Sequence, residues 1–254
     1  MNNDDQPRRK FLRQVFTILP ATALTPVLVT QEGCTHSDAS VNPQATATVA
    51  TATTAAANDD KVPYAPVYFT SAEWAFLHAA VDELIPADAS GAGALEAGVP
   101  EFIDRQMETP YGHGKLWYMQ GPFHPEAAPE LGYQLGLVPR DVYRHGIEAC
   151  NAWCVREHGK PFAALPPDTR VQILEALEAG KLHLDAVPPK LFFNTLLKNT
   201  KEGYFADPMY GGNKGMAGWK TIGFPGARAD YADWVEQPGE KYALGPVSIL
   251  GEQA

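Results

Sequence analysis

Apolar residues recur at helical spacing along much of residues 70–203, and end signals divide this stretch into separate elements. Thr70 and Glu73 have the spacing of a capping box, and Pro86 ends the apolar series that follows them. A shorter helix is expected over residues 99–108. Longer helices are expected over residues 139–158, 166–180 and 188–203, because each opens with proline, which suits the first turn of a helix.

Two stretches rich in glycine, proline and aromatic residues interrupt this pattern, residues 111–137 and 203–254. Neither shows the alternation that is typical of a strand, and no internal repeat is found. We therefore predict a mostly α fold, with one irregular helical domain over residues 61–254, long ordered loops and an extended C-terminal arm. Long loops in a compact domain are usually functional, so both stretches are candidate sites.

Residues 1–34 have the composition of an export signal, in which basic residues precede an apolar run. Two prolines break this run, and it is too short for a convincing transmembrane span. An arginine pair before Phe-Leu resembles the bacterial twin-arginine signal, although Pro7 and Arg13 depart from the usual pattern. The twin-arginine translocase carries folded proteins, so we expect folding or assembly before export to the periplasm. The signal residues are Arg8, Arg9, Phe11 and Leu12.

Cys34 is a candidate lipid anchor, because the small residue that a lipoprotein signal requires precedes it as Gly33. Gln31 and Glu32 do not fit such a signal, so a cysteine that is discarded with the signal, or left just after it, is the alternative. Residues 35–60 consist largely of alanine and threonine and cannot bury enough apolar surface to offset the entropy of folding. We predict that they form a disordered tether.

The charge balance argues against two classes of partner. The chain has 30 acidic and 20 basic residues, a formal net charge of −10. Binding to nucleic acid needs clustered lysine and arginine to neutralise phosphates, and docking on anionic lipid needs the same. No nucleic-acid partner is therefore predicted.

Few residues have a spacing that suits catalysis or metal binding. Cys150 and Cys154 are four apart on a predicted helix, where the Cβ atoms lie about 5–6 Å apart. A disulfide needs about 3.5–4.5 Å, so buried free thiols are expected, with a bridge to a partner chain as the lesser alternative. Cys154 and His158 make only two potential ligands, and no metal site is predicted. The helix carboxylates are expected on solvated faces, and they are Asp82, Glu83, Glu96, Glu101 and Asp104.

Residues 202–228 hold a glycine-rich stretch that does not match a dinucleotide fingerprint, because the glycines have the wrong spacing and follow a helix instead of a strand. Glycine permits close backbone approach, and aromatic rings supply contact area, so the stretch suits docking. Packing on its own domain is the alternative. The predicted docking residues are Tyr204, Phe205, Asp207, Tyr210, Gly211, Gly212, Asn213, Gly215, Trp219, Gly223, Phe224 and Pro225.

A second aromatic loop lies at the start of residues 111–137 and is also suited to docking. Its candidate docking residues are Tyr111, Gly112, Trp117, Tyr118, Gly121, Pro122 and Phe123. No catalytic constellation and no cofactor fingerprint is found in the sequence, so neither a catalytic residue nor a cofactor is predicted for this chain.

Three motifs together resemble the gluconate 2-dehydrogenase subunit 3 family over most of residues 64–235: "EGYFADPMYGGNKGMAGWKTIGFPGAR", "YGHGKLWYMQGPF" and "LGYQLGLVPRDVYRHGIEA". The resemblance implies a small subunit of a membrane-associated, flavin-dependent dehydrogenase of sugars or sugar acids. It implies that a separate large subunit binds FAD and oxidises the substrate, and that a multihaem cytochrome c subunit often passes electrons to quinone. It also implies that the small subunit carries the export signal for a flavoprotein that lacks one.

The leading hypothesis is a non-catalytic subunit that supports export, assembly and stability of the FAD-bearing subunit and is held at the membrane through the complex. One alternative is a self-contained periplasmic enzyme with a site between the aromatic loops, using His113, His124 or Asp207. Another is a lipid-anchored binding protein. The choice of sugar would belong to the flavin subunit, which this chain does not contain.

Overall fold

The computed structural model describes residues 64–229, 232–240 and 242–254, so the predicted signal, the tether and Cys34 lie outside the described residues. The described part is mostly helical, and within it only isolated β-bridges occur, with no sheet. The prediction of a mostly α fold is confirmed. Its α-helices are α2 (Ser71–Leu84), α3 (Val99–Met107), α4 (Pro139–His158), α5 (Pro167–Glu178), α6 (Pro189–Phe205) and α7 (Ala217–Ile222).

The helix ends follow the local sequence signals closely. Thr70 accepts from the Glu73 N–H while the Glu73 carboxylate accepts from the Thr70 N–H, which is the predicted capping box. Prolines open α4, α5 and α6. Gly159 ends α4 in the left-handed conformation, with a φ of 72°. The short α7 and several 3-10 turns lie in stretches that were expected to be irregular.

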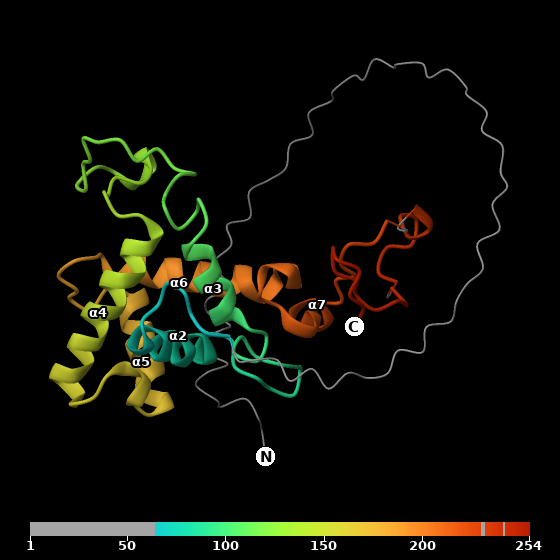
Figure 1. Ribbon diagram of the computed structural model, residues 1–254, viewed down its shortest axis with the longest axis horizontal. Coiled ribbons are helices and arrows are strands. Elements are labelled where there is room, and N and C mark those ends of the chain that lie inside the picture. Colours follow the sequence, from blue (N-terminus) through green and yellow to red (C-terminus); the bar gives the residue numbers. More distant parts are fainter. Residues whose placement is uncertain (1–63, 230–231, 241) are drawn as a thin grey trace. The chain divides into compact units, whose positions relative to one another are not determined.

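Helix α6 is the centre of the helical body and packs on α3, α4 and α5, with α7 beyond its C-terminal end (Figure 1). Three fully buried rings pack together here, those of Phe76, Phe162 and Phe192. The Phe162 centroid lies 4.5 Å and the Phe192 centroid 5.9 Å from the Phe76 centroid. Burying such a ring stabilises the fold by about 1.5–3 kcal/mol. Gly146 lets α4 approach α6 closely, since a Cβ there would lie 2.2 Å from the Phe192 ring.

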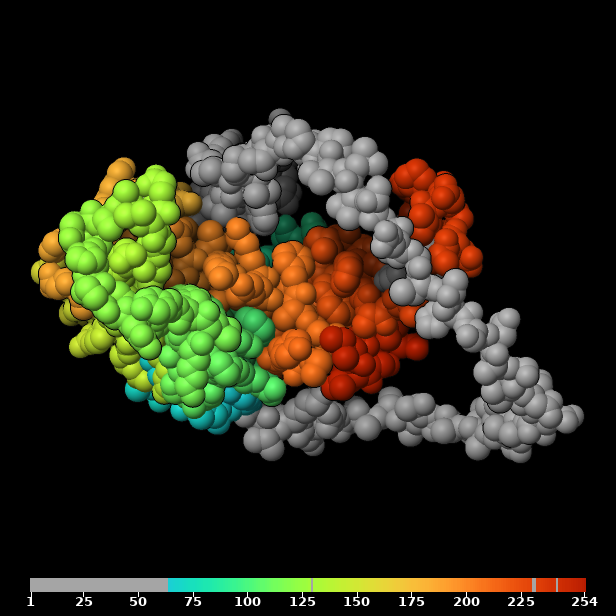
Figure 2. Space-filling view, turned by 90° about the horizontal axis from the view of Figure 1, so that it is seen from above, coloured from blue at the N-terminus to red at the C-terminus, as the bar shows by residue number. Residues whose placement is uncertain are grey.

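The end of the C-terminal arm folds back on the segment that follows α7. The Ala227 N–H donates to the Val247 carbonyl, and the Val247 N–H donates to the Pro225 carbonyl. The Ile249 N–H then donates to Asp207 Oδ2 at 2.7 Å, which ties the tail to the end of α6. Figure 2 shows the dark red tail against this orange part of the surface.

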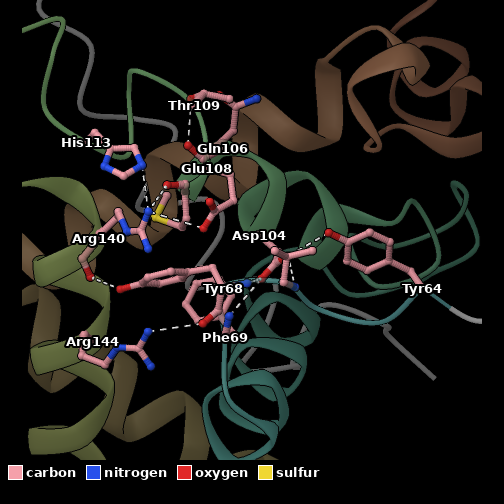
Figure 3. Close-up of polar contacts among 12 residues, drawn as sticks. Tyr64, Tyr68, Phe69, Asp104, Gln106, Glu108, Thr109, His113, Arg140 and Arg144 are labelled. Carbon is pink, nitrogen blue, oxygen red and sulfur yellow. Dashed lines mark hydrogen bonds and ion pairs between the residues drawn. The ribbon is translucent and has the colours of Figure 1, made fainter.

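Asp104 of α3 anchors the start of the described chain, residues 64–69, which we call the N-terminal strap (Figure 3). Its carboxylate is fully buried and accepts four hydrogen bonds. The Tyr64 hydroxyl and the Val67 N–H donate to Oδ2, each at 2.7 Å. The N–H groups of Tyr68 and Phe69 donate to Oδ1, each at 3.0 Å. Burial, reinforced by the bond to Asp104, raises the pKa of Tyr64.

Two arginines of α4 hold the strap from the other side (Figure 3). The guanidinium carbons of Arg140 and Arg144 each lie 4.5 Å from the Tyr68 ring centroid, a cation–π distance. The Tyr68 hydroxyl donates to the Arg140 carbonyl at 2.7 Å, and Arg144 pairs with Glu73 at 2.5 Å. The strap is therefore fixed between α3 and α4.

The prediction that the helix carboxylates face solvent is wrong for three of them. Besides Asp104, Glu83 is 2% exposed and Glu101 is 8% exposed. Glu83 pairs with Arg170 of α5 at 2.9 Å. Glu101 pairs with both Arg105 and Lys214, each at 2.5 Å. Most of these basic partners come from distant segments, so helical periodicity alone could not reveal them.

Candidate docking surface

The glycine-rich stretch folds into a compact turn region around Asn213, residues 206–219, which we call the Asn213 turn. This side chain is fully buried, and its backbone is left-handed with a φ of 46°. Its Nδ2 donates to the Ala206 carbonyl at 2.9 Å, and its Oδ1 accepts from the Gly218 N–H at 2.8 Å. Asparagine tolerates this conformation better than most residues and satisfies both backbone groups at once. The Asn213 turn is therefore attached to the C-terminal end of α6.

Close packing on α6 explains why two positions in the Asn213 turn are glycine. A Cβ at Gly212 would lie 2.2 Å from the Gly203 carbonyl oxygen, and a Cβ at Gly218 would lie 2.1 Å from the Tyr204 carbonyl oxygen. Both obstacles are backbone atoms of α6, which cannot move aside cheaply. These glycines serve approach to the chain itself.

Besides Asn213, three predicted docking side chains are occupied inside the domain. Tyr204 and Trp219 are each 5% exposed, and their polar atoms donate to the carbonyls of Ala92 and Phe205. Asp207 is 7% exposed, and its oxygens accept from the N–H groups of Met209 and Ile249. These three side chains therefore pack on their own domain, which was the alternative to docking on a partner. Gly211 and Gly212 are buried as well.

The remaining predicted docking residues of the stretch reach the surface. The exposed fractions are 36% for Phe205, 47% for Tyr210 and 44% for Phe224. Gly215 and Gly223 are exposed in left-handed turns, and Pro225 is half-buried. The part of the predicted docking segment that can meet a partner is therefore its aromatic edge.

The second aromatic loop is anchored at one ring and exposed at the next. Tyr111 is half-buried, and Trp117 packs on it at 6.1 Å and on Tyr133 at 5.2 Å. Trp117 is 38% exposed and Tyr118 is 80% exposed. Gly112 is buried under this turn. Of the other predicted members, Gly121 and Pro122 are exposed and joined by a cis peptide bond, and Phe123 is half-buried.

The two aromatic loops meet at one concavity of about 670 Å³, which we call the aromatic groove. Leu116 and Trp117 contribute one side, and Phe205 and Tyr210 contribute the other. Figure 2 shows the green surface of the loop beside the orange surface of α6. The sequence predicted both loops separately, and the fold brings them together across α3 and α6.

The groove has an apolar part and a polar part. Phe102 and Tyr111 line it together with the four side chains already named. Its polar groups come from Gln106, Lys198, Glu202 and Asp207. Lys198 Nζ lies 3.7 Å from Glu202 Oε1, and their side chains are 60% and 46% exposed. A surface that is mostly aromatic with a few polar groups is typical of recognition sites.

Asn199 supports the groove from beneath and was missed by the sequence reasoning as a site residue. It is fully buried on α6 and bonds to the hydroxyls of Tyr111 and Tyr143 at 3.0–3.2 Å and to Glu202 at 2.8 Å. Burial raises the pKa of both tyrosines, so their hydroxyls stay protonated as donors. An asparagine on the apolar face of a predicted helix was the only available signal.

Of the residues in the alternative enzyme hypothesis, His113 and His124 do not line the aromatic groove, whereas Asp207 does. His113 Nε2 lies 2.8 Å from Arg140 Nη1, so this nitrogen accepts from the guanidinium (Figure 3). His124 Nδ1 lies 3.5 Å from the Glu126 carboxylate on the exposed loop. Asp207 is used by two backbone N–H groups. Their contacts are structural or with neighbouring side chains.

Cys150 and Cys154 are buried free thiols, as predicted. Hydrogen bonding to Cys154, together with burial, raises the pKa of Cys150. In the part of the chain that the structure describes, no three side chains of histidine, cysteine or acidic type gather closely enough to hold a metal ion. Nor does any helix there combine the length and apolar character that crossing a bilayer requires.

The outer face of α2 has a smaller concavity of about 410 Å³, lined by Trp74, His78, Asp82 and Arg170 among others. The His78 ring lies 4.6 Å from the Trp74 ring, and its Nε2 is buried without a hydrogen-bond partner among the described residues. Burial lowers the pKa of His78.

Fold and groove together define a helical protein that exposes an aromatic face, which is a surface typical of proteins that work in assemblies. The family model described as gluconate 2-dehydrogenase subunit 3 matches residues 71–226, more than half of the chain. The chain therefore belongs to this family, and it is a subunit of an oxidoreductase complex that contains other subunits. Comparison with curated proteins and with solved structures gave no match.

Proposed function

We propose that this chain is a non-catalytic subunit that binds the FAD-bearing subunit of its dehydrogenase complex and supports the stability, assembly and export of that subunit. The observation that carries the proposal is the aromatic groove, which unites two loops inside the family-matched region. Large apolar side chains in and beside it are left exposed, among them Leu116, Tyr118 and Tyr210. Exposed apolar surface of this kind is stabilised when a partner covers it.

The signal motif supplies the export part of the proposal. Arg8 and Arg9 lie outside the described residues, so this part rests on the sequence pattern. A twin-arginine route would carry the flavoprotein across the membrane as a folded complex with this chain. FAD and haem c would then belong to the partner subunits, the complex would lie in the periplasm, and the chain would reach the membrane through it or through a lipid on Cys34.

Co-expression of this chain with the FAD-bearing subunit tests the proposal. The tagged chain purified from the periplasm should carry flavin absorbance, whereas the chain expressed alone should show neither flavin nor haem absorbance. Replacing Arg8 and Arg9 with lysine should leave both subunits in the cytoplasm. Normal export of the FAD-bearing subunit with the double variant would contradict the escort role, and turnover by the isolated chain would contradict the non-catalytic role.

A further inference from the structure

We infer that the aromatic groove binds an extended segment of the FAD-bearing subunit, with one aromatic or large aliphatic side chain lodged beside Leu116, Trp117 and Tyr210. This inference rests on the proposed function and adds to it the place of contact and the chemistry of the occupant.

The apolar part of the groove requires an apolar occupant. Leu116 is 68% exposed and Tyr210 is 47% exposed, although both line the same concavity. Trp117 is held between Tyr111 and Tyr133, so its ring is already ordered before a partner arrives. A preordered aromatic wall loses little conformational entropy on binding, which favours a hot spot there.

The polar part of the groove favours a peptide over a lipid chain. Gln106 offers a donor and an acceptor, Lys198 offers donors, and Glu202 offers acceptors. The main chain of an extended peptide presents N–H and C=O groups in alternation, so it can use both kinds of partner. An acyl chain would leave them unused.

The net charge of the whole chain makes a second copy the poorer occupant. Its formal net charge is −10, so two copies repel each other at low ionic strength. The subunit to which the family assignment points is a different protein, which is free of that symmetric repulsion.

The N-terminal strap does not line the groove. Asp104 fixes the strap on one side of α3, whereas Phe102 and Gln106 of the same helix line the groove. Positions two residues apart on an α-helix point roughly 200° apart. The strap therefore meets α3 on the side away from the groove.

Charge substitutions at the two most exposed groove positions test the inference in the co-expressed complex. Leu116→Asp and Tyr210→Asp should each lower the flavin carried per tagged chain at least about tenfold, because a desolvated carboxylate would face an apolar side chain. Val155→Asp is the matched control, since Val155 is 50% exposed on α4 and does not line the groove. It should retain the wild-type flavin content.

Urea unfolding of each variant chain alone separates contact from folding, and unchanged midpoints are expected. Wild-type flavin content with both groove variants would overturn the inference while leaving the proposed function intact. Absence of flavin from the wild-type chain would instead overturn the proposed function.

A photoreactive residue at position 116 adds a direct measurement in the same complex. It should cross-link to the FAD-bearing subunit, and the same residue at position 155 should not. Cross-linking from position 116 to a second copy would overturn the inference. So would a cross-link within the chain that disappears when residues 1–60 are deleted.

Discussion

Replacing Asp104 with alanine is expected to release the N-terminal strap from α3. The carboxylate is fully buried, and its two oxygens accept from Tyr64, Val67, Tyr68 and Phe69 at distances of 2.7 to 3.0 Å. Alanine removes all four acceptor contacts in one step. The three backbone N–H groups then must find water, which the buried Phe69 N–H can do only if the strap moves.

The size of the effect follows from three contributions. A hydrogen bond to a charged group contributes about 1.5–3 kcal/mol net, so the four bonds together contribute about 6–12 kcal/mol. Exposing the Phe69 ring costs about 2 kcal/mol more. The freed residues 64–69 regain chain entropy of about 1 kcal/mol each, which offsets roughly 6 kcal/mol. Over the lower half of the hydrogen-bond range, about 6–9 kcal/mol, the expected loss of unfolding free energy is about 2–5 kcal/mol.

Urea unfolding followed by circular dichroism measures this loss. Asp185→Ala is the matched control, because its side chain is 95% exposed and only pairs with an equally exposed His183. It should change the free energy of unfolding by no more than about 0.5 kcal/mol. If Asp104→Ala falls within about 1 kcal/mol of this control, the anchoring role of the carboxylate is refuted.

Two further predictions concern glycine and histidine. Gly212→Ala should destabilise the chain more than Gly215→Ala in urea unfolding, because its Cβ would meet the Gly203 carbonyl oxygen at 2.2 Å, whereas Gly215 has open space and only left-handed strain; equal losses would contradict this. Burial lowers the pKa of His78, so its contribution to stability is present above about pH 6.5 and is lost as the pH falls through the lowered pKa. His78→Gln should therefore show a shallower fall of the urea midpoint below about pH 6.5, and an unchanged fall would refute this.

Helices could be predicted from the sequence because their signals are local. The capping box at Thr70 and Glu73 joins residues three apart, and the prolines that open α4, α5 and α6 act on the first turn alone. The irregular loop after Tyr111 was equally readable from its glycines and prolines. Each of these features depends on neighbours along the chain.

Contacts between distant segments could not be predicted in the same way. Asp104 meets the strap across 35 to 40 residues of sequence, and Tyr143 meets Asn199 across 56. Helical spacing placed these polar residues on elements but gave no information on their partners. For Asp104 this led to the wrong expectation of a solvated face. The groove likewise depends on how α3 and α6 pack, so the sequence could supply its two loops but not their meeting.

The length of the glycine-rich motif does not measure the size of an interaction surface. Within the domain, backbone groups are satisfied by Asn213 and Trp219, and close packing is permitted by Gly212. The Asn213 turn would therefore need these residues even without a partner. The side chains of Phe205 and Tyr210 stay 36% and 47% exposed, although the Phe205 ring also contacts Tyr204 at 5.1 Å. A substitution in the first group should therefore lower stability and partner binding together, whereas one in the second group should lower partner binding alone. Measuring stability and partner binding for both groups therefore separates the docking proposal from the folding of the Asn213 turn.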